Sequence, residues 1–499
     1  RHTWTGEDDE RNPNWERSYA QVKKNILHAF VETYSLSLQQ TLRQLASAAG
    51  SAPGGDGRSA GRELPALAVR DWPGTAVRGV TEGFYGEPWT QSQRLDQLDF
   101  LGRTKQNRYL YAPGYDPYRQ ARWRDPYPAG QRADFRELAA RARANHVTLA
   151  WAVQPGQRFC FSSERDRRDL LRKVDAMWAL GVRAFQLQLQ DVSYSEWHCG
   201  ADREEFGEGP KAAAEAQART ANALAAHLAE RHPSAAPLSL MPTEFYQEGS
   251  TAYRKALAAA LHDRVEVVWS GVGVVPRTIT GGEFAAAEKT FRHPLLTQDN
   301  YPINDYADDR VFLGPYQGRE PAVAIRSAAV LSNAMQQPLA SRIPLFTAAD
   351  YAWNPRGYDA QASWRAAVDD LAGGSGKSRA ALRTLAANSV SSVLGAEESA
   401  YLRPRLAELW RAYESRDGKA LARAAERLRP EFRAMRTARA DLASVADGAL
   451  AAEVRPWLTQ LARYGEAGER SVDLLLAQAR DDGAGAWRAR AELERVRVE

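Results

Sequence analysis

Apolar and polar positions alternate in short runs through residues 76–372, and longer helical stretches separate these runs. The stretch FQLQLQD, residues 185–191, places an amide at every second position, which is the period of a strand with two different faces. The stretch SERDRRDLLRKVDAMWALG, residues 163–181, repeats its apolar residues at helical spacing instead. Strands and amphipathic helices therefore follow one another along this region.

Eight runs have the composition of strands, at residues 76–84, 106–113, 147–155, 184–191, 237–245, 265–271, 294–300 and 342–350. Eight strands that alternate with helices over about 300 residues predict an α/β fold, a parallel (β/α)8 TIM barrel. A doubly wound open sheet is the alternative. We favour the barrel because the strand count reaches eight and no GxGxxG motif follows the first strand.

The flanking regions differ from the barrel region. Residues 1–75 predict an accessory region, with one helical face from Tyr19 to Phe30 and a Gly/Ser/Ala-rich linker at residues 47–61. Residues 375–499 contain no convincing strand, and Leu402, Leu406 and Leu409 share one helical face. The predicted domains are therefore 1–75, a catalytic barrel at 76–372 and a C-terminal α-helical bundle at 375–499.

Composition narrows the function classes. The net charge is +4 and no block of Lys or Arg appears, so we expect no nucleic-acid partner. No apolar run approaches the roughly 18 residues of a membrane span, and we expect no membrane partner. Neither HExxH nor GxSxG occurs. We expect no cofactor.

The two cysteines, Cys160 and Cys199, follow the third and fourth predicted strands. Neighbouring strand–loop units are adjacent in a barrel, so we expect these residues to approach each other closely. A disulfide and two free thiols both remain open. His198 would make a third metal ligand, but no matching fourth ligand is present, and we expect no metal site.

In such barrels, function lies at the carboxyl ends of the strands. Polar residues at these ends are Glu82, Asp116, Gln190, Asp191, Glu244, Asp299 and Asp350. Aromatic residues such as Phe84, Tyr85 and Tyr301 lie between them. Carboxylates and amides mixed with aromatic rings suit a sugar, which needs hydrogen bonds for its hydroxyls and a flat apolar surface for its ring.

Five separate motifs, in order along the chain, resemble the family 84 glycoside hydrolases. They are VRGVTEGFYGEPWT (residues 77–90), YLYAPGYDPY (109–118), WSGVGVVPRTIT (269–280), DNYPINDY (299–306) and TAADYAWNP (347–355). This family includes the β-N-acetylglucosaminidases and O-GlcNAcases. The resemblance implies a hydrolase that acts on glycans or glycoproteins containing N-acetylglucosamine, and an extracellular location.

The resemblance also implies a retaining mechanism in which the acetamido oxygen of the substrate attacks the anomeric carbon and forms an oxazoline. This differs from the usual scheme of two carboxylates. In the family, two adjacent acids end the fourth strand. The general acid/base falls on Asp191, and the residue that orients the acetamido N–H falls on Gln190.

Other positions that line the sugar pocket in the family fall on Gly83, Ser270, Val274, Asn300, Asp305 and Asn333. Three positions depart from the pattern. Gly114 stands for a lysine, Phe245 for a tyrosine and Gln298 for a tryptophan. Gln190, Gly114 and Phe245 keep a second hypothesis open, a non-catalytic or altered-specificity glycan-binding barrel.

Overall fold

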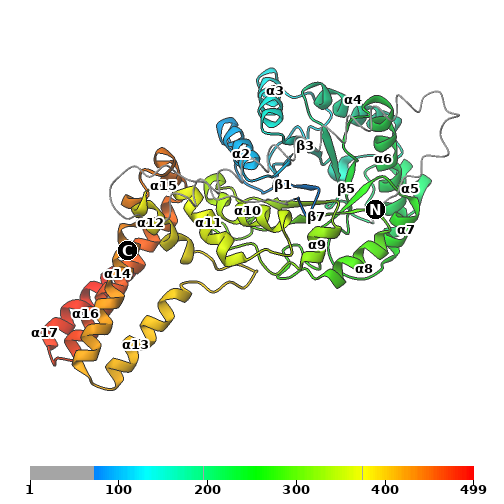
Figure 1. The fold of residues 1–499 in the computed structure, drawn as a ribbon. Helices are drawn as coiled ribbons and strands as arrows, with labels where there is room; N and C mark the ends of the chain where they lie inside the picture. Colours follow the sequence, from blue (N-terminus) through cyan, green and yellow to red (C-terminus); the bar gives the residue numbers. More distant parts are fainter. Residues whose placement is uncertain (1–71, 195, 374, 499) are drawn as a thin grey trace.

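The computed structural model describes residues 72–498 except 195 and 374. The helix and linker predicted within residues 1–71 lie outside the described residues. Eight parallel strands form a closed barrel in chain order, with β1 pairing with both β2 and β8 (Figure 1). The strands are β1 (Val77–Glu82), β2 (Arg108–Tyr111), β3 (Thr148–Val153), β4 (Ala184–Gln188), β5 (Ser239–Met241), β6 (Glu266–Trp269), β7 (Leu295–Asp299) and β8 (Ala329–Asn333). The predicted TIM barrel is confirmed.

The alternation within β4 separates the two faces of the sheet. Phe185 and Leu187 pack into the core between barrel and helices, as does Leu189 just beyond the strand. Gln186 and Gln188 are buried inside the barrel, where Gln186 Nε2 donates to Gln298 Oε1 of β7 at 3.2 Å. Small residues such as Ala150, Ala152 and Ala184 leave room there for these amides. Continuing this period of two, Gln190 faces the mouth of the barrel.

Helices cover the outside of the barrel (Figure 1). They are α2 (Gln91–Arg103), α3 (Ala129–Ala144), α4 (Glu164–Ala179), α5 (Gly200–Phe206), α6 (Pro210–Arg231), α7 (Ala252–Ala260), α8 (Gly281–Phe291), α9 (Pro321–Arg326) and α10 (Pro338–Trp353). Several start at a hydroxyl cap: Ser163 accepts from Asp166 N at 3.2 Å ahead of α4. The helix predicted from residues 163–181 is therefore present.

The predicted eighth strand was wrong. Residues 342–350 lie in α10, and the eighth strand is β8 at Ala329–Asn333. Most residues of α10 are buried, because the helix lies between the barrel and the C-terminal helices. A helix buried on nearly all sides lacks the polar face that marks an amphipathic helix in a sequence. Asp350 consequently lies on this helix and not at a strand end.

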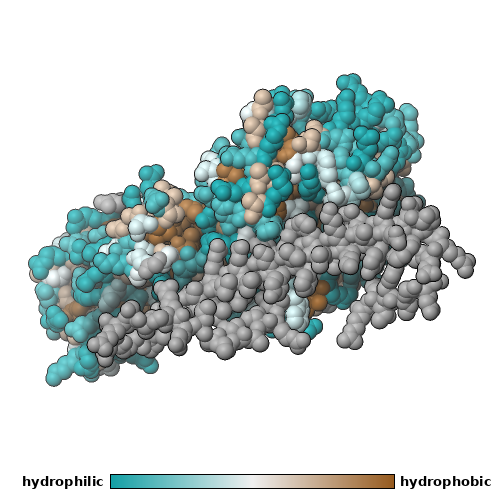
Figure 2. All heavy atoms as spheres, turned by 45° about the horizontal axis from the view of Figure 1, so that its top comes forward, coloured by the Kyte–Doolittle hydropathy of each residue, from teal (hydrophilic) through white to brown (hydrophobic). Residues whose placement is uncertain are grey.

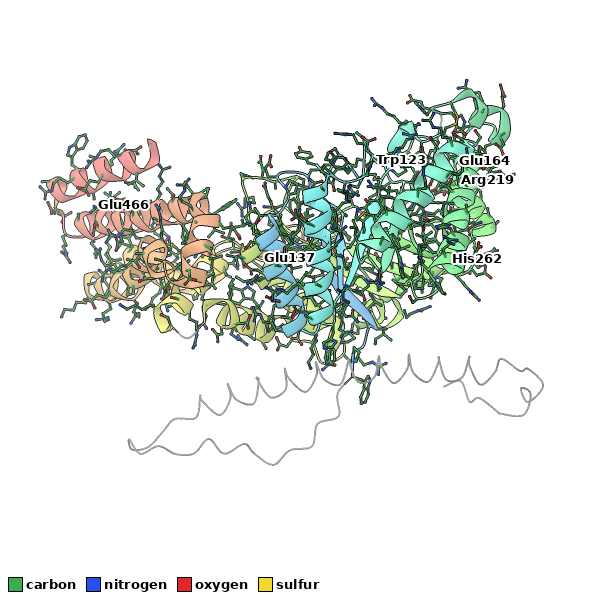
Figure 3. All side chains as sticks on the ribbon, turned by 90° about the horizontal axis from the view of Figure 1, so that it is seen from above. Trp123, Glu137, Glu164, Arg219, His262 and Glu466 are labelled. Carbon is green, nitrogen blue, oxygen red and sulfur yellow. A yellow bond between two sulfur atoms is a disulfide. The ribbon has the colours of Figure 1, made fainter. Side chains whose placement is uncertain are left out.

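The C-terminal region extends away from the barrel as a group of helices (Figure 1). They are α11 (Ala360–Ala372), α12 (Gly376–Ala387), α13 (Arg403–Glu414), α14 (Gly418–Asp441), α15 (Ala449–Glu453), α16 (Arg455–Gln478) and α17 (Gly483–Val498). Their buried residues form one cluster with those of α10. In Figure 3, Glu466 marks α16 in this region, and Glu164 and Arg219 mark α4 and α6 on the barrel.

On the coloured part of the face in Figure 2, hydrophilic residues predominate and surround smaller apolar patches. Among the described residues, no helix is both long enough and apolar enough to pass through a membrane.

Candidate active site

A cavity of about 1030 Å³ opens at the carboxyl ends of the strands. Its walls come from the loops that follow the barrel strands, which is where TIM barrels place their active sites. Most of the predicted site residues line this cavity: Gln190, Asp191, Gly83, Phe245, Val274, Asn300, Asp305 and Asn333. The structure therefore brings together residues that are up to 250 positions apart in the sequence.

Asp191 follows β4 and is exposed to the cavity. Gln154, directly after β3, donates from Nε2 to Asp191 Oδ2 at 2.7 Å. Asp191 Oδ1 accepts no hydrogen bond from the described residues, so this oxygen is accessible to a ligand. A carboxyl group with one oxygen held and the other open is suited to proton transfer.

Gln190 adjoins Asp191 and also lines the cavity. Its Oε1 is buried, and no donor among the described residues reaches it. Buried polar atoms nearly always have a partner, and leaving one without costs about 1–3 kcal/mol. Because the side chain lines the cavity, a rotation of its amide would present this oxygen to a donor on a bound ligand.

Asn333 and Asn300 belong to a chain of hydrogen bonds along one wall. Asn333 Oδ1 accepts from Gly83 N, and Asn333 Nδ2 donates to Asn300 Oδ1, both at 3.0 Å. Asn300 Nδ2 donates to Val274 O at 2.9 Å. A Cβ at position 83 would lie 2.9 Å from Asn333 Oδ1, so this close approach requires glycine. The wall is held in place before any ligand binds.

Asp305 is tied to the loop after β1. Its Oδ2 accepts from Tyr85 N at 2.9 Å. Burial raises the pKa of Asp305, although the backbone N–H donors around it act in the opposite direction. Burial, with the nearby charge of Asp191, also raises the pKa of Tyr85. Both side chains line the cavity, where they can form hydrogen bonds with sugar hydroxyls.

The three departures from the family pattern also reach the cavity. Gly114, Phe245 and Gln298 line it. A Cβ at position 114 would lie 2.6 Å from Tyr85 Cδ1 and 2.9 Å from Phe84 O, so the ring of Tyr85 takes the space a longer residue would need. Gln298 is held by Gln186 inside the barrel.

Ser270 does not line the cavity. It is fully buried and donates from Oγ to Gly273 O at 3.1 Å. This hydrogen bond holds the backbone of the loop that carries Val274, so Ser270 stabilises the loop and does not contact a ligand in the cavity.

Three strand-end acids are structural. Glu82 pairs with Arg94 at 2.7 Å, and Asp299 pairs with Arg319 at 2.6 Å, with both carboxylates fully buried. Asp116 accepts from the hydroxyls of Tyr111 at 2.9 Å and Tyr127 at 2.6 Å. Buried charges need such partners, and these three acids face them instead of the cavity.

Glu244 does line the cavity, but its carboxylate is already engaged. It accepts from Tyr194 Oη at 2.6 Å and from Thr251 Oγ1 at 2.6 Å, and it lies 3.2 Å from Arg254 Nε. Burial and the bond to Glu244 raise the pKa of Tyr194 far above its ordinary value. This group of residues stiffens the wall after β5.

Sequence reasoning missed Gln154 and Arg119, which both line the cavity. A signal for Gln154 was present, because it stands at the carboxyl end of the third strand. The sequence contained no such signal for Arg119, because its contacts with β3 and β4 depend on the tertiary fold.

Cys160 and Cys199 form a disulfide with a Cα–Cα distance of 5.8 Å, so the expected close approach is confirmed. It ties the loop after β3 to the loop that carries Tyr194 and Trp197. The two sulfurs lie near Asp202, but bridged cysteines offer no thiolate to a metal.

Comparisons with known proteins agree with this geometry. The model of the β-N-acetylglucosaminidase family matches residues 78–387, and a hyaluronidase post-catalytic domain-like model matches residues 401–499. Protein O-GlcNAcase of Rattus norvegicus is 30% identical over 295 residues, 58% of this chain and 31% of the rat protein. The Mus musculus protein is 30% identical over 288 residues, 56% and 30% of the two chains. The chain spans about a third of the length of these curated relatives.

Solved structures show the same similarity. A mutant of Thermobaculum terrenum O-GlcNAc hydrolase superposes with a TM-score of 0.76 at 28% identity, covering 85% of this chain and 89% of that one. CpGH84B superposes with a TM-score of 0.75 at 28% identity, covering 85% and 74%. Since the family model covers more than half of the chain, the protein belongs to the β-N-acetylglucosaminidases of glycoside hydrolase family 84.

Proposed function

We propose that this protein is a retaining β-N-acetylglucosaminidase that removes a 2-acetamido sugar from a glycan or glycoprotein. One observation carries the proposal: the Oε1 of Gln190, adjacent to Asp191 in the cavity, is buried and has no donor within the described part of the chain. An acceptor without a partner suits the acetamido N–H of such a sugar. No cofactor is needed for this chemistry.

In the proposed reaction, the acetamido oxygen of the substrate forms a bond to the anomeric carbon. The bond from that carbon to the leaving oxygen breaks, and Asp191 gives its proton to that oxygen. Water then attacks the anomeric carbon, Asp191 takes the proton of the water, and the oxazoline opens to the acetamide. Two displacements at one carbon retain its configuration.

Gln190 orients the acetamido group in this scheme. Its Oε1 accepts the N–H that becomes acidic as positive charge develops on the ring. An amide cannot offset that charge as a carboxylate does, which costs on the order of 2–4 kcal/mol of transition-state stabilisation. We therefore expect slow turnover and not its absence. Asn300, Asp305 and Asn333 hold the sugar hydroxyls and the acetamido region.

The alternative is a barrel that binds a glycan without cleaving it. Gln190 and Gly114 favour it, because the first lacks the charge and the second the lysine of the family pattern. Hydrolysis of a chromogenic N-acetylglucosaminide by the wild type, beside a glycan-binding panel, separates the two. Asp191→Asn is the matched variant, and we expect a loss of about 10²–10⁴ in rate on substrates with poor leaving groups. Binding without hydrolysis in the wild type would establish the alternative.

We further propose that the protein works in an oxidising compartment, such as the extracellular space. The Cys160–Cys199 disulfide supports this, because disulfides persist where thiols are not kept reduced. Thiol titration of unfolded, unreduced protein isolated from its native host tests it, and two free thiols would contradict it.

A further inference from the structure

We infer that Gln154 is the positioning residue of the general acid/base, holding Asp191 by one carboxylate oxygen and connecting it to the buried guanidinium of Arg119. The inference rests on the proposed role of Asp191. It adds a residue that neither the sequence motifs nor the family resemblance indicated.

The contact between Gln154 and Asp191 is direct. Gln154 is nearly buried at the end of β3, and its Nε2 donates to Asp191 Oδ2 at 2.7 Å. Oδ2 is thereby committed as an acceptor, so the proton that Asp191 transfers resides on Oδ1. This fixes both the rotation of the carboxyl group and the oxygen that faces the leaving group.

The amide of Gln154 is itself held from its other end. Its Oε1 accepts from Gln120 Nε2 at 2.8 Å and from Arg119 Nη1 at 3.4 Å. Its backbone N–H donates to Arg119 O at 2.8 Å. The amide therefore has one orientation, with its N–H aimed at Asp191.

Arg119 gives this arrangement its electrostatic character. Only 1% of the residue is exposed, and burial lowers its pKa. Within the described part of the chain, every oxygen that accepts from it is a backbone carbonyl or an amide oxygen, in Pro113, Ala152, Gln154 and Gln188. Its charge thus polarises the amide of Gln154, which strengthens the N–H donor toward Asp191.

Three other titratable groups line the cavity around this contact. Tyr85 comes from the loop after β1, and its pKa is raised by burial and by Asp191 but lowered by Arg119 and Gln154. Glu244, from the loop after β5, accepts a hydrogen bond from Tyr194 and forms an ion pair with Arg254. Asp305 from the loop after β7 accepts from the backbone of Tyr85. Of these three groups Gln154 interacts only with Tyr85, and Asp191 is the carboxylate that it contacts.

A donor to a carboxylate stabilises the ionised form. Removing the donor favours the protonated form of Asp191, which is the form that the first step requires. The basic limb of the pH–rate profile, where that proton is lost, then moves to higher pH. A residue with a merely structural role would lower the rate at every pH without moving this limb.

Gln154→Met tests this, because methionine keeps the length of glutamine but has no N–H donor. We expect kcat/KM on an N-acetylglucosaminide to fall about tenfold to a hundredfold, and the basic limb of the pH–rate profile to move to higher pH. Gln154→Glu, which places a second carboxylate against Asp191, should move it further. Gln361→Met, an exposed glutamine on α11, is the control and should leave the profile unchanged.

Should Gln154→Met fail to fold, as judged by thermal unfolding, Gln120→Met removes support from the same amide and should move the limb less, in the same direction. An unmoved limb in the folded variants overturns the inference and leaves the proposed function intact. A wild type without turnover at any pH overturns the proposed function, and the inference with it.

Discussion

At the scale of single residues, neighbours in the chain have opposite environments. Asp191 has one oxygen held by Gln154, whereas the Oε1 of Gln190 is buried without a partner among the described residues. The ligand-free protein therefore carries a desolvation cost that a ligand N–H relieves. Substitutions of Gln190 therefore test both the proposed reaction and the proposed class of substrate.

Gln190→Asp should raise turnover on N-acetylglucosaminides by roughly tenfold, because a charge-assisted bond to the acetamido N–H is stronger than a neutral one. Two adjacent carboxylates should also displace the pH–rate profile. Gln190→Glu adds the same charge but keeps the length of glutamine. Comparing it with Gln190→Asp separates the effect of the charge from the effect of side-chain length. Gln190→Ala removes the acceptor and should lower kcat; unchanged kinetics in that variant would contradict the assignment.

Gly114→Ala should destabilise the protein by about 1–3 kcal/mol, the usual range for overpacking. The added Cβ would meet both the Tyr85 ring and the carbonyl of Phe84. Urea unfolding measures the change. Gly130→Ala, in the first turn of α3, is the control, since no atom lies within 4 Å of a Cβ there. It should leave the stability unchanged or raise it by up to about 1 kcal/mol. A Gly114→Ala variant as stable as the wild type would contradict the prediction.

At the scale of elements, the loops after β3 and β4 carry Gln154, Gln190 and Asp191, and the disulfide joins them beyond the site. The neighbouring Asp202 adds to this connection, because its carboxylate accepts from Phe161 N at 2.9 Å and Ser162 N at 2.7 Å. The disulfide and these two hydrogen bonds thus join the two loops that flank Gln190 and Asp191.

Reduction of the disulfide should lower the free energy of unfolding by about 3–4 kcal/mol, from the chain entropy of a loop with a sequence separation of 39. Urea unfolding with and without reductant measures this. The double variant Cys160→Ser/Cys199→Ser should match the reduced wild type and not respond to reductant. A response in that variant would place the effect elsewhere.

At the scale of the whole molecule, the C-terminal helices attach to the barrel through α10. Glu453 of α15 accepts from Leu339 N at 3.1 Å and Ala340 N at 2.8 Å, in the first turn of α10. These N–H groups have no partner within their own helix, so a residue of the C-terminal region completes a helix of the barrel.

Burial raises the pKa of Glu453 to about 7, against the opposing effect of those two N–H donors and of Arg342. The folded state thus binds this proton more tightly than the unfolded state does. Stability should therefore decrease as the pH rises from the ordinary range of glutamate to about 7, and this contribution should be constant above that. In Glu453→Gln the decrease should disappear. Unfolding measured from pH 4 to 8 checks it, with the exposed Glu414→Gln as control.

The sequence by itself determined the features that depend on local periodicity. The period of two in FQLQLQD separated Leu187 from Gln188 and set Gln190 toward the cavity, since successive side chains of a strand point to opposite faces. The order of strands and helices predicted the barrel, and the positions of Cys160 and Cys199 after neighbouring strands predicted their approach.

The tertiary structure decided what depends on contacts between distant segments. Residues 342–350 became part of α10, because a helix buried on nearly all sides shows no polar face in its sequence. Glu82 and Asp299 form ion pairs with arginines, and Asp191 accepts a hydrogen bond from Gln154. These partners are distant in the sequence and come into contact only in the folded barrel. Strand ends identify candidate residues, but the partners that assemble around each one separate an acid that stabilises the fold from one that is free to react.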